Sequence, residues 1–154
     1  MLLGLVLFLA VPPLQDVASG GKLEKTARKM IAVIRHTRGL AAATGMPHLL
    51  TLDVEKSRYW IGPEVSREDP LGDEKVEVLE QHILPSSIKF KDAETAGRGL
   101  VVSGETSIHF WANGLVEPST VHLRDDKNRD LTLILNPLTG SVVVLNKYVV
   151  QKTQ

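Results

Sequence analysis

Residues 22–47 read KLEKTARKMIAVIRHTRGLAAATGMP, and this stretch decides the architecture of the chain. Apolar or small side chains recur in it at steps of three, four and seven residues, which is the period of one face of an α-helix. Gly45 followed by Pro47 is a typical helix stop. We therefore predict an amphipathic helix over residues 22–44. Its apolar stripe is formed by Leu23, Ala27, Met30, Ile31, Ile34 and Ala41, with Leu40 beside it.

The other side of this helix is basic. It carries Lys22, Lys25, Arg28, Lys29, Arg35 and Arg38. Such a face can bind lipid or nucleic acid. The simpler interpretation is a solvated outer face on a helix whose stripe covers a sheet, because no aromatic residues interleave with the basic ones. Ser19 and Gly20-Gly21 are predicted to let the chain pause before this helix or to cap it.

The N-terminal residues 1–14, MLLGLVLFLAVPPL, contain no charged or polar side chain. As a helix they cover roughly 21 Å, whereas a bilayer core needs about 30 Å. Three interpretations are open: a signal-peptide core, a buried N-terminal helix, and a membrane helix that lacks its first turns, which we favour. The predicted membrane or filament residues are Leu2, Leu3, Leu5, Val6, Leu7, Phe8, Leu9, Val11 and Pro12.

Beyond residue 47 the hydrophobic period changes to two, which is typical of half-buried strands. Residues 48–54 and 58–61 suggest a hairpin, and residues 62–74 a surface loop with five acids. Further strands are predicted around 76–83, 88–91, 100–102, 108–112, 121–124, 131–135 and 141–145, with turns at Asn113-Gly114 and at 136–140. One helical region followed by seven to nine short strands indicates an α+β fold with antiparallel sheet.

The composition excludes several function classes. The 154 residues carry no net charge and no Cys, which argues against bulk binding of nucleic acid and excludes disulfides, a thiolate nucleophile and Cys-bearing zinc sites. The zero charge is the sum of +4 over residues 1–52, −5 over 53–82 and +1 over 83–154.

Candidate chemistry is weak throughout the sequence. His109 and His122 could neighbour each other across strands beside a carboxylate, but surface or half-exposed strand positions explain them more simply. Asp126, Asn128 and Asp130 open like a calcium loop, yet Leu131 stands where that loop needs Gly, so a polar hairpin turn is favoured. We expect no catalytic residue, no metal site and no cofactor, and hence no enzyme.

Several motifs occur in a characteristic order: the apolar run ending in Pro, the helix closing at residues 44–47 (TGMP), residues 108–110 (IHF) before Asn113-Gly114, and residues 136–140 (NPLTG). This combination resembles the minor pseudopilins of type II secretion systems, specifically general secretion pathway protein H, and the related minor pilins of type IV pili. The resemblance implies a pilin-like fold: a helical stem, residues 1–46, packed on a periplasmic antiparallel β head, residues 47–154. The turn residues that carry it are Asn113, Gly114, Asn136, Pro137, Thr139 and Gly140.

The resemblance also implies a function. The subunit would be structural and methylated, anchored in the inner membrane of a Gram-negative bacterium, and would assemble with other pseudopilins through its helix and head. No nucleic-acid partner is expected. Gly140 is suited to a positive φ between two strands, and Pro137 restricts the residue before it to an extended shape.

The sequence departs from the family pattern at its start. Family members begin with a basic leader, then Gly-Phe-Thr-Leu and a Glu, whereas the first acid here is Asp16. We expect Met1 to be internal, with about ten mature residues upstream at 1.5 Å each. In-frame upstream codons without the leader motif would contradict this expectation.

The charge distribution bears on orientation. The net +5 between residues 22 and 38 would place that side in the cytoplasm by the positive-inside rule, whereas the resemblance places it in the periplasm. Two rival functions remain: a type IV minor pilin, with a possible role in DNA uptake, and a small secreted enzyme or binding module with a signal peptide that ends near Ser19.

Overall fold

The computed structural model describes residues 14–64 and 77–151, as one long helix and nine strands. The helix α1 spans Leu14–Thr44. The strands are β1 (His48–Asp53), β2 (Arg58–Pro63), β3 (Glu80–Ile83), β4 (Ile88–Thr95), β5 (Gly99–Val101), β6 (Glu105–Phe110), β7 (Ser119–Asp125), β8 (Asp130–Leu135) and β9 (Val142–Leu145).

The helix begins earlier than predicted. It starts at Leu14 and passes through Ser19-Gly20-Gly21 without a break, so the predicted pause or cap at these residues was wrong. Each glycine in a helix lowers helix stability by about 1 kcal/mol relative to alanine. The helix continues through these glycines because extending an existing helix is easier than starting a new one. The predicted end is confirmed: Gly45 follows the last turn with φ of 67°, a left-handed conformation that favours glycine.

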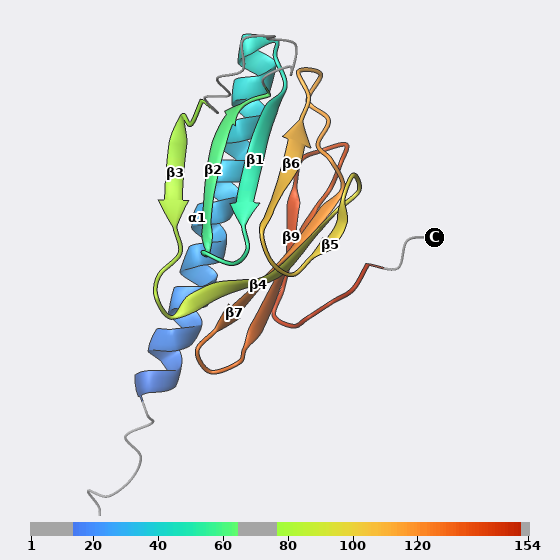
Figure 1. Ribbon diagram of the computed structural model, residues 1–154. Helices are drawn as coiled ribbons and strands as arrows, with labels where there is room; N and C mark the ends of the chain where they lie inside the picture. The colour runs from blue at the N-terminus through green and yellow to red at the C-terminus, as the bar shows by residue number, and fades with distance from the viewer. Residues whose placement is uncertain (1–13, 65–76, 152–154) are drawn as a thin grey trace, which may run out of the picture.

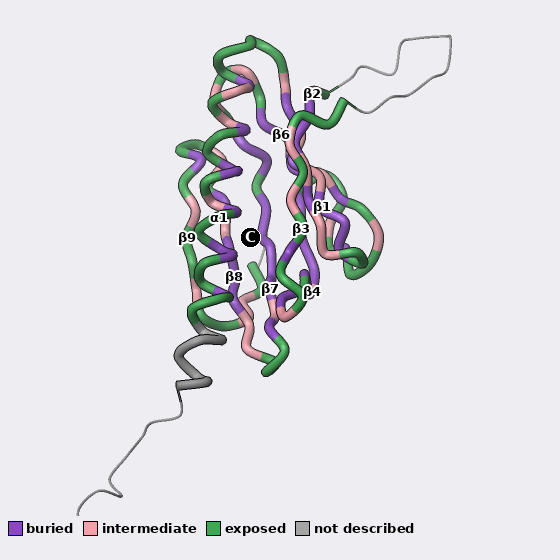
Figure 2. Tube along the Cα trace, turned by 90° about the vertical axis from the view of Figure 1, so that its left-hand side faces the viewer, coloured by how far each residue is buried: buried purple, intermediate pink, exposed green. Residues whose placement is uncertain are grey.

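Most of the predicted apolar stripe of α1 is buried, but Ile31 and Leu40 are only half-buried, and Val33, which was not predicted, is buried. Leu23, Met30 and Ile34 are among its core residues, and the buried positions face the strands (Figure 2). Thr26 and Thr37 are buried beside them because each hydroxyl donates to the carbonyl four residues earlier. The predicted basic face is exposed at Lys22, Lys25, Arg28, Lys29 and Arg35.

The strands form two antiparallel sheets. Sheet A has the order β3-β2-β1-β6 and sheet B the order β5-β4-β7-β8-β9. The predicted first hairpin is confirmed, with His48 opposite Pro63 and Asp53 opposite Arg58. The helix contacts β1 and β6 of sheet A and β7 and β8 of sheet B, so its stripe closes one core over both sheets (Figure 1). The predicted α+β class is therefore confirmed.

Two strands differ from their predicted patterns. Of the strand predicted around residues 76–83, the described residues 77–83 form strand only at β3, where the half-buried side chains are Glu80 and His82 while Ile83 is exposed. Strand β7, predicted to be half-buried, is buried at all but one of its positions. Its inner face meets α1, and its outer face is covered by the residues that follow β9.

Candidate functional site

The predicted membrane or filament residues lie outside the described residues. These are Leu2, Leu3, Leu5, Val6, Leu7, Phe8, Leu9, Val11 and Pro12. In the part of the chain that the structure describes, no helix combines the length and the apolar composition that crossing a bilayer requires.

The predicted Asn113-Gly114 turn is present after β6. Gly114 has φ of 87°, its N–H donates to the Trp111 carbonyl at 3.0 Å, and the Asn113 side chain accepts from the Leu115 N–H at 3.1 Å. The asparagine therefore supplies the side-chain acceptor of an Asx turn, and the glycine takes the left-handed position.

The predicted turn at residues 136–140 is built in the same way. The Asn136 side chain accepts from the N–H groups of Leu138 and Thr139 at 3.0 and 3.1 Å. Gly140 has φ of 66°, which confirms the predicted positive value, and its N–H donates to the Asn136 carbonyl at 2.9 Å. The Thr139 hydroxyl accepts from the Ser141 N–H at 3.2 Å.

The two turns meet at the helix. The Val116 N–H donates to the Pro137 carbonyl at 2.9 Å, which ties one turn to the other. Arg38 of α1 lies against both turns. At the first turn its Nε donates to the Gly114 carbonyl at 2.8 Å. A Cβ added to Gly140 would lie 2.5 Å from the Arg38 Cδ. Arg38 thus links the end of the helix to both turns, in addition to the packing of the apolar stripe.

Sequence reasoning missed the role of Arg38, which it placed on the solvated face. A signal was available in the spacing. Ile34, Arg38 and Ala41 follow one another at steps of four and three, so the arginine occupies a position of the apolar stripe rather than the centre of the basic face. Its aliphatic stem lies over the junction while its guanidinium reaches a carbonyl.

The two strand histidines lie in different sheets, each with its own carboxylate. His109 of β6 places Nδ1 at 2.8 Å from Glu117 and Nε2 at 3.5 Å from Glu64, and it is half-exposed as the simpler interpretation expected. Glu117 is buried and also accepts the N–H groups of Gly97 at 2.6 Å and His109 at 3.1 Å. This cluster pins the connection between β6 and β7 to the end of β4.

His122 of β7 is fully buried, so the expectation of a surface or half-exposed position was wrong for it. Its Nδ1 lies 2.5 Å from the Asp92 carboxylate and its Nε2 2.8 Å from the Val149 carbonyl. A β-bulge between Phe90 and Asp92 makes this pair possible. The extra residue shifts the alternation of side chains between the two faces of the sheet, so that the Asp92 side chain faces His122 rather than the core.

The arrangement around His122 lacks the geometry of nucleophilic catalysis. A general base needs a free ring nitrogen beside a hydroxyl or thiol, and here Nε2 faces a main-chain carbonyl. Among the described residues, no three His, Cys, Asp or Glu side chains are placed to share a metal ion.

The turn between β7 and β8 is the polar hairpin turn that was favoured over a calcium loop. Asp125 organises it: its carboxylate accepts the N–H groups of Lys127 and Arg129 at 2.9 Å and the Arg129 Nε at 2.8 Å. Burial alone would raise the pKa of Asp125, but these hydrogen bonds and the guanidinium charge outweigh it, and the pKa is lowered.

Because its folded-state pKa is lowered, Asp125 contributes stability above its unfolded value near 3.8, and this stability is lost as pH falls through the lower folded value. We expect Asp125→Asn to reduce the acid-induced loss of stability in urea unfolding curves recorded between about pH 5 and pH 2. Exposed Asp126→Asn is the matched control. An unchanged acid profile in Asp125→Asn would contradict the assignment.

Comparison with known proteins supports the fold. No protein-family model and no curated protein sequence matches this chain. Two solved structures of the minor pseudopilin EpsH from the type 2 secretion system of Vibrio cholerae are similar, both at 13% identity, with TM-scores of 0.58 and 0.55. The first match covers 81% of this chain and 97% of the EpsH chain, and the second covers 83% and 98%.

The type IV minor pilin FimU of Pseudomonas aeruginosa is also similar, at 12% identity with a TM-score of 0.54, over 81% of this chain and 89% of FimU. At these identities the likeness concerns the fold. The chain has the pilin-like α+β fold seen in minor pseudopilins and type IV minor pilins.

Proposed function

We propose that the chain is a structural minor pseudopilin of a type II secretion pseudopilus, which assists protein export across the outer membrane. The observation that carries the proposal is the projecting stem. The helix begins at Leu14, and Figure 1 shows its first turns extending beyond the strands of the head. Among residues 21–44, whose burial the structure describes, the buried stripe begins at Leu23. The uncharged residues 1–14 lead directly into this stem.

The stem fits a subunit that passes from membrane to filament. An apolar helical segment is stable in the hydrocarbon core of a bilayer, and it is also stable in the apolar centre of a bundle formed with the stems of other subunits. Arg38, seated on two turns of the head, would transmit force along the helix to both sheets. In this proposal the apolar segment anchors the subunit in the inner membrane, the head lies in the periplasm, and other pseudopilins contact the helix and head surfaces.

The proposed role is not enzymatic and needs no cofactor. A nucleic-acid partner is also not part of it, because residues 83–154 carry a net charge of only +1 and the basic side chains of α1 lie on a helix face without aromatic residues. A gel shift with the full chain and double-stranded DNA should therefore be negative.

A type IV minor pilin is the second candidate, favoured by the likeness to FimU. The two candidates differ in what their filament does, so the phenotype of a deletion separates them. Loss of pili with normal secretion would favour this second function.

Deletion of the gene in the source bacterium is expected to leave exported proteins in the periplasm, and the full chain should restore their release. A chain with Leu7→Glu should fail, because a charge in a bilayer or an apolar filament core costs about 2–3 kcal/mol or more. Leu138→Glu is the matched control, since Leu138 is 73% exposed in a turn of the head. Normal secretion and normal pili in the deletion strain would contradict both functions.

A further inference from the structure

The basic side chains of α1 differ in their contacts with the rest of the chain. Arg38 reaches the head, where its Nε donates to a main-chain carbonyl at 2.8 Å. Arg28 lies 3.7 Å from Glu24, one turn earlier on the helix, so these two charges largely cancel. Arg35 is exposed and lies nearer the end of the helix that packs on the head turns. The positive charge at the start of the helix therefore comes from its lysines.

Three lysines form a row along one side of α1. Positions three and four apart lie on the same side of an α-helix, and this row, which we call the lysine row, consists of Lys22, Lys25 and Lys29. All three side chains are exposed, and none of them forms an ion pair within residues 14–64 and 77–151, which the structure describes. The lysine row thus presents three cations to solvent side by side.

The lysine row lies at the end of α1 that adjoins the uncharged residues 1–14. With a rise of 1.5 Å per residue, its three positions lie about 12, 17 and 23 Å along the helix axis from Leu14. The Cα–Cβ bonds of a helix tilt toward its N-terminus, so the lysine side chains start out in the direction of the apolar segment. If that segment lies in a bilayer, the headgroup layer extends about 5–8 Å beyond the hydrocarbon, and flexible lysine stems of about 6 Å reach toward it.

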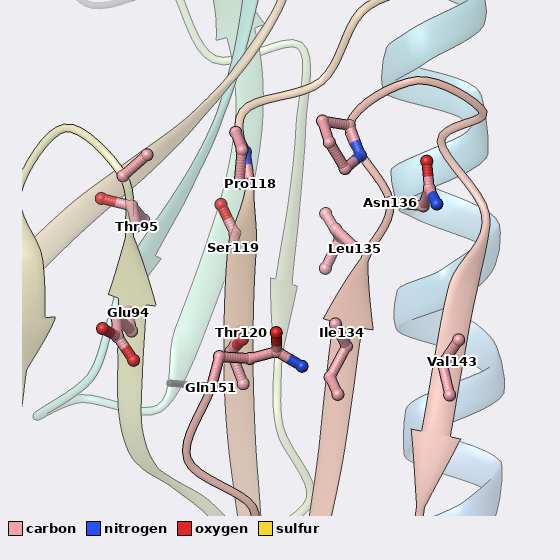
Figure 3. Close-up of a pocket in the computed structure, with 12 residues that line it drawn as sticks. Glu94, Thr95, Pro118, Ser119, Thr120, Ile134, Leu135, Asn136, Val143 and Gln151 are labelled. Carbon is pink, nitrogen blue, oxygen red and sulfur yellow. The ribbon is translucent and has the colours of Figure 1, made fainter. Parts of the chain in front are cut away.

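The hollow on the head does not suit an anionic ligand. A trough of about 400 Å³ lies on the outer face of sheet B. Figure 3 shows Glu94, Thr120, Ile134 and Val143 among the side chains that line it. The described residues around this trough include the Glu94 carboxylate and no Lys or Arg. Attraction of an anionic partner is therefore expected at the lysine row and not in the trough.

We propose that the lysine row binds the headgroups of anionic phospholipids at the surface of the bilayer that holds the apolar segment. This inference rests on the membrane anchor of the proposed function and adds a lipid preference to it. Lysine suits this partner, because its compact charge on a flexible stem can follow a mobile headgroup. Nucleic acid is the poorer fit, because no aromatic side chain interleaves with the lysines for a base to stack on.

The test uses NMR of the full chain in phosphatidylcholine bicelles that contain a trace of lipid with a nitroxide near its headgroup. The labelled lipid is phosphatidylglycerol in one sample and phosphatidylcholine in the other. Each label broadens nearby amide signals, so the ratio of the two effects measures the local preference for the anionic lipid. We expect a ratio of about five or more at the amides of the lysine row, which corresponds to the attraction of one surface lysine to anionic lipid. The ratio should approach one in about 1 M salt, where the screening length is about 3 Å.

The neutral label separates this inference from the anchor on which it rests. It should broaden the amide signals at the start of α1 whether or not anionic lipid is preferred. If neither label broadens them, the membrane anchor is contradicted and the lipid contact with it. If both labels broaden the signals of the lysine row equally at low salt, the lipid contact alone is overturned.

Variants assign the preference to the lysine row. Changing its three lysines to glutamine should bring the ratio to about one without disturbing the helix, because glutamine and lysine have nearly equal helix propensities. Changing the three to arginine keeps the charge and should keep the ratio. The matched control removes the same charge from exposed positions of the head, by Lys56→Gln, Lys89→Gln and Lys147→Gln, and should leave the ratio unchanged. A ratio that persists in the glutamine variant of the row, or that falls equally in the head control, would overturn the proposal.

Discussion

Gly140→Ala is expected to lower the free energy of unfolding by about 2–4 kcal/mol. A non-glycine residue at φ of 66° costs about 1–2 kcal/mol. The added Cβ would also lie 2.5 Å from the Arg38 Cδ, so the arginine must move and weaken its hydrogen bond to the Gly114 carbonyl. Urea unfolding followed by the fluorescence of Trp60 and Trp111 measures the loss.

Two controls separate the backbone from the contact. Gly45 has nearly the same φ, 67°, but a Cβ there meets no atom within 4 Å, so Gly45→Ala should show only the backbone cost of about 1–2 kcal/mol. In an Arg38→Ala background, Gly140→Ala should likewise fall to that value. If Gly140→Ala lowers the free energy of unfolding by the same amount with and without Arg38, the described contact of Arg38 with the two turns is contradicted.

Ile34→Ala should lower the free energy of unfolding by about 2–5 kcal/mol, because Ile34 is 0% exposed in the stripe that closes the core over the two sheets. The higher helix propensity of alanine returns only a few tenths of a kcal/mol. The same change at Ile83, which is 73% exposed in β3, should alter stability by at most about 0.5 kcal/mol. Similar losses at the two positions would show that the helix does not pack as described.

The local elements were predictable because local physics determines them. The period of the apolar stripe and the Gly45 stop gave the body and end of α1, and the alternation of side chains gave most strands. Both turns, at Asn113-Gly114 and at residues 136–140, use an asparagine side chain as acceptor and a glycine with positive φ. Short sequence motifs encode both features.

The features that sequence reasoning missed depend on contacts between distant segments. The division of the strands into two sheets rests on pairings such as β1 with β6, more than 50 residues apart along the chain. His122 looked like an outward-facing strand residue, because nothing in the pattern of β7 reveals that residues 147–151 return to cover it. The bulge at Lys91 that turns Asp92 toward His122 is likewise invisible to a strict period of two.

The most direct test of the central proposal, a membrane-anchored pilin-like subunit with a periplasmic head, uses the absence of cysteine from the sequence. A single cysteine replaces Leu138, which is 73% exposed, or Ala41, which is 0% exposed and serves as the buried control. A membrane-impermeant maleimide is then added to cells whose outer membrane has been made permeable. We expect the Leu138→Cys head to be labelled while the inner membrane is intact, and Ala41→Cys only after denaturation. Labelling of Leu138→Cys only after the inner membrane is broken would place the head in the cytoplasm and contradict the proposed function.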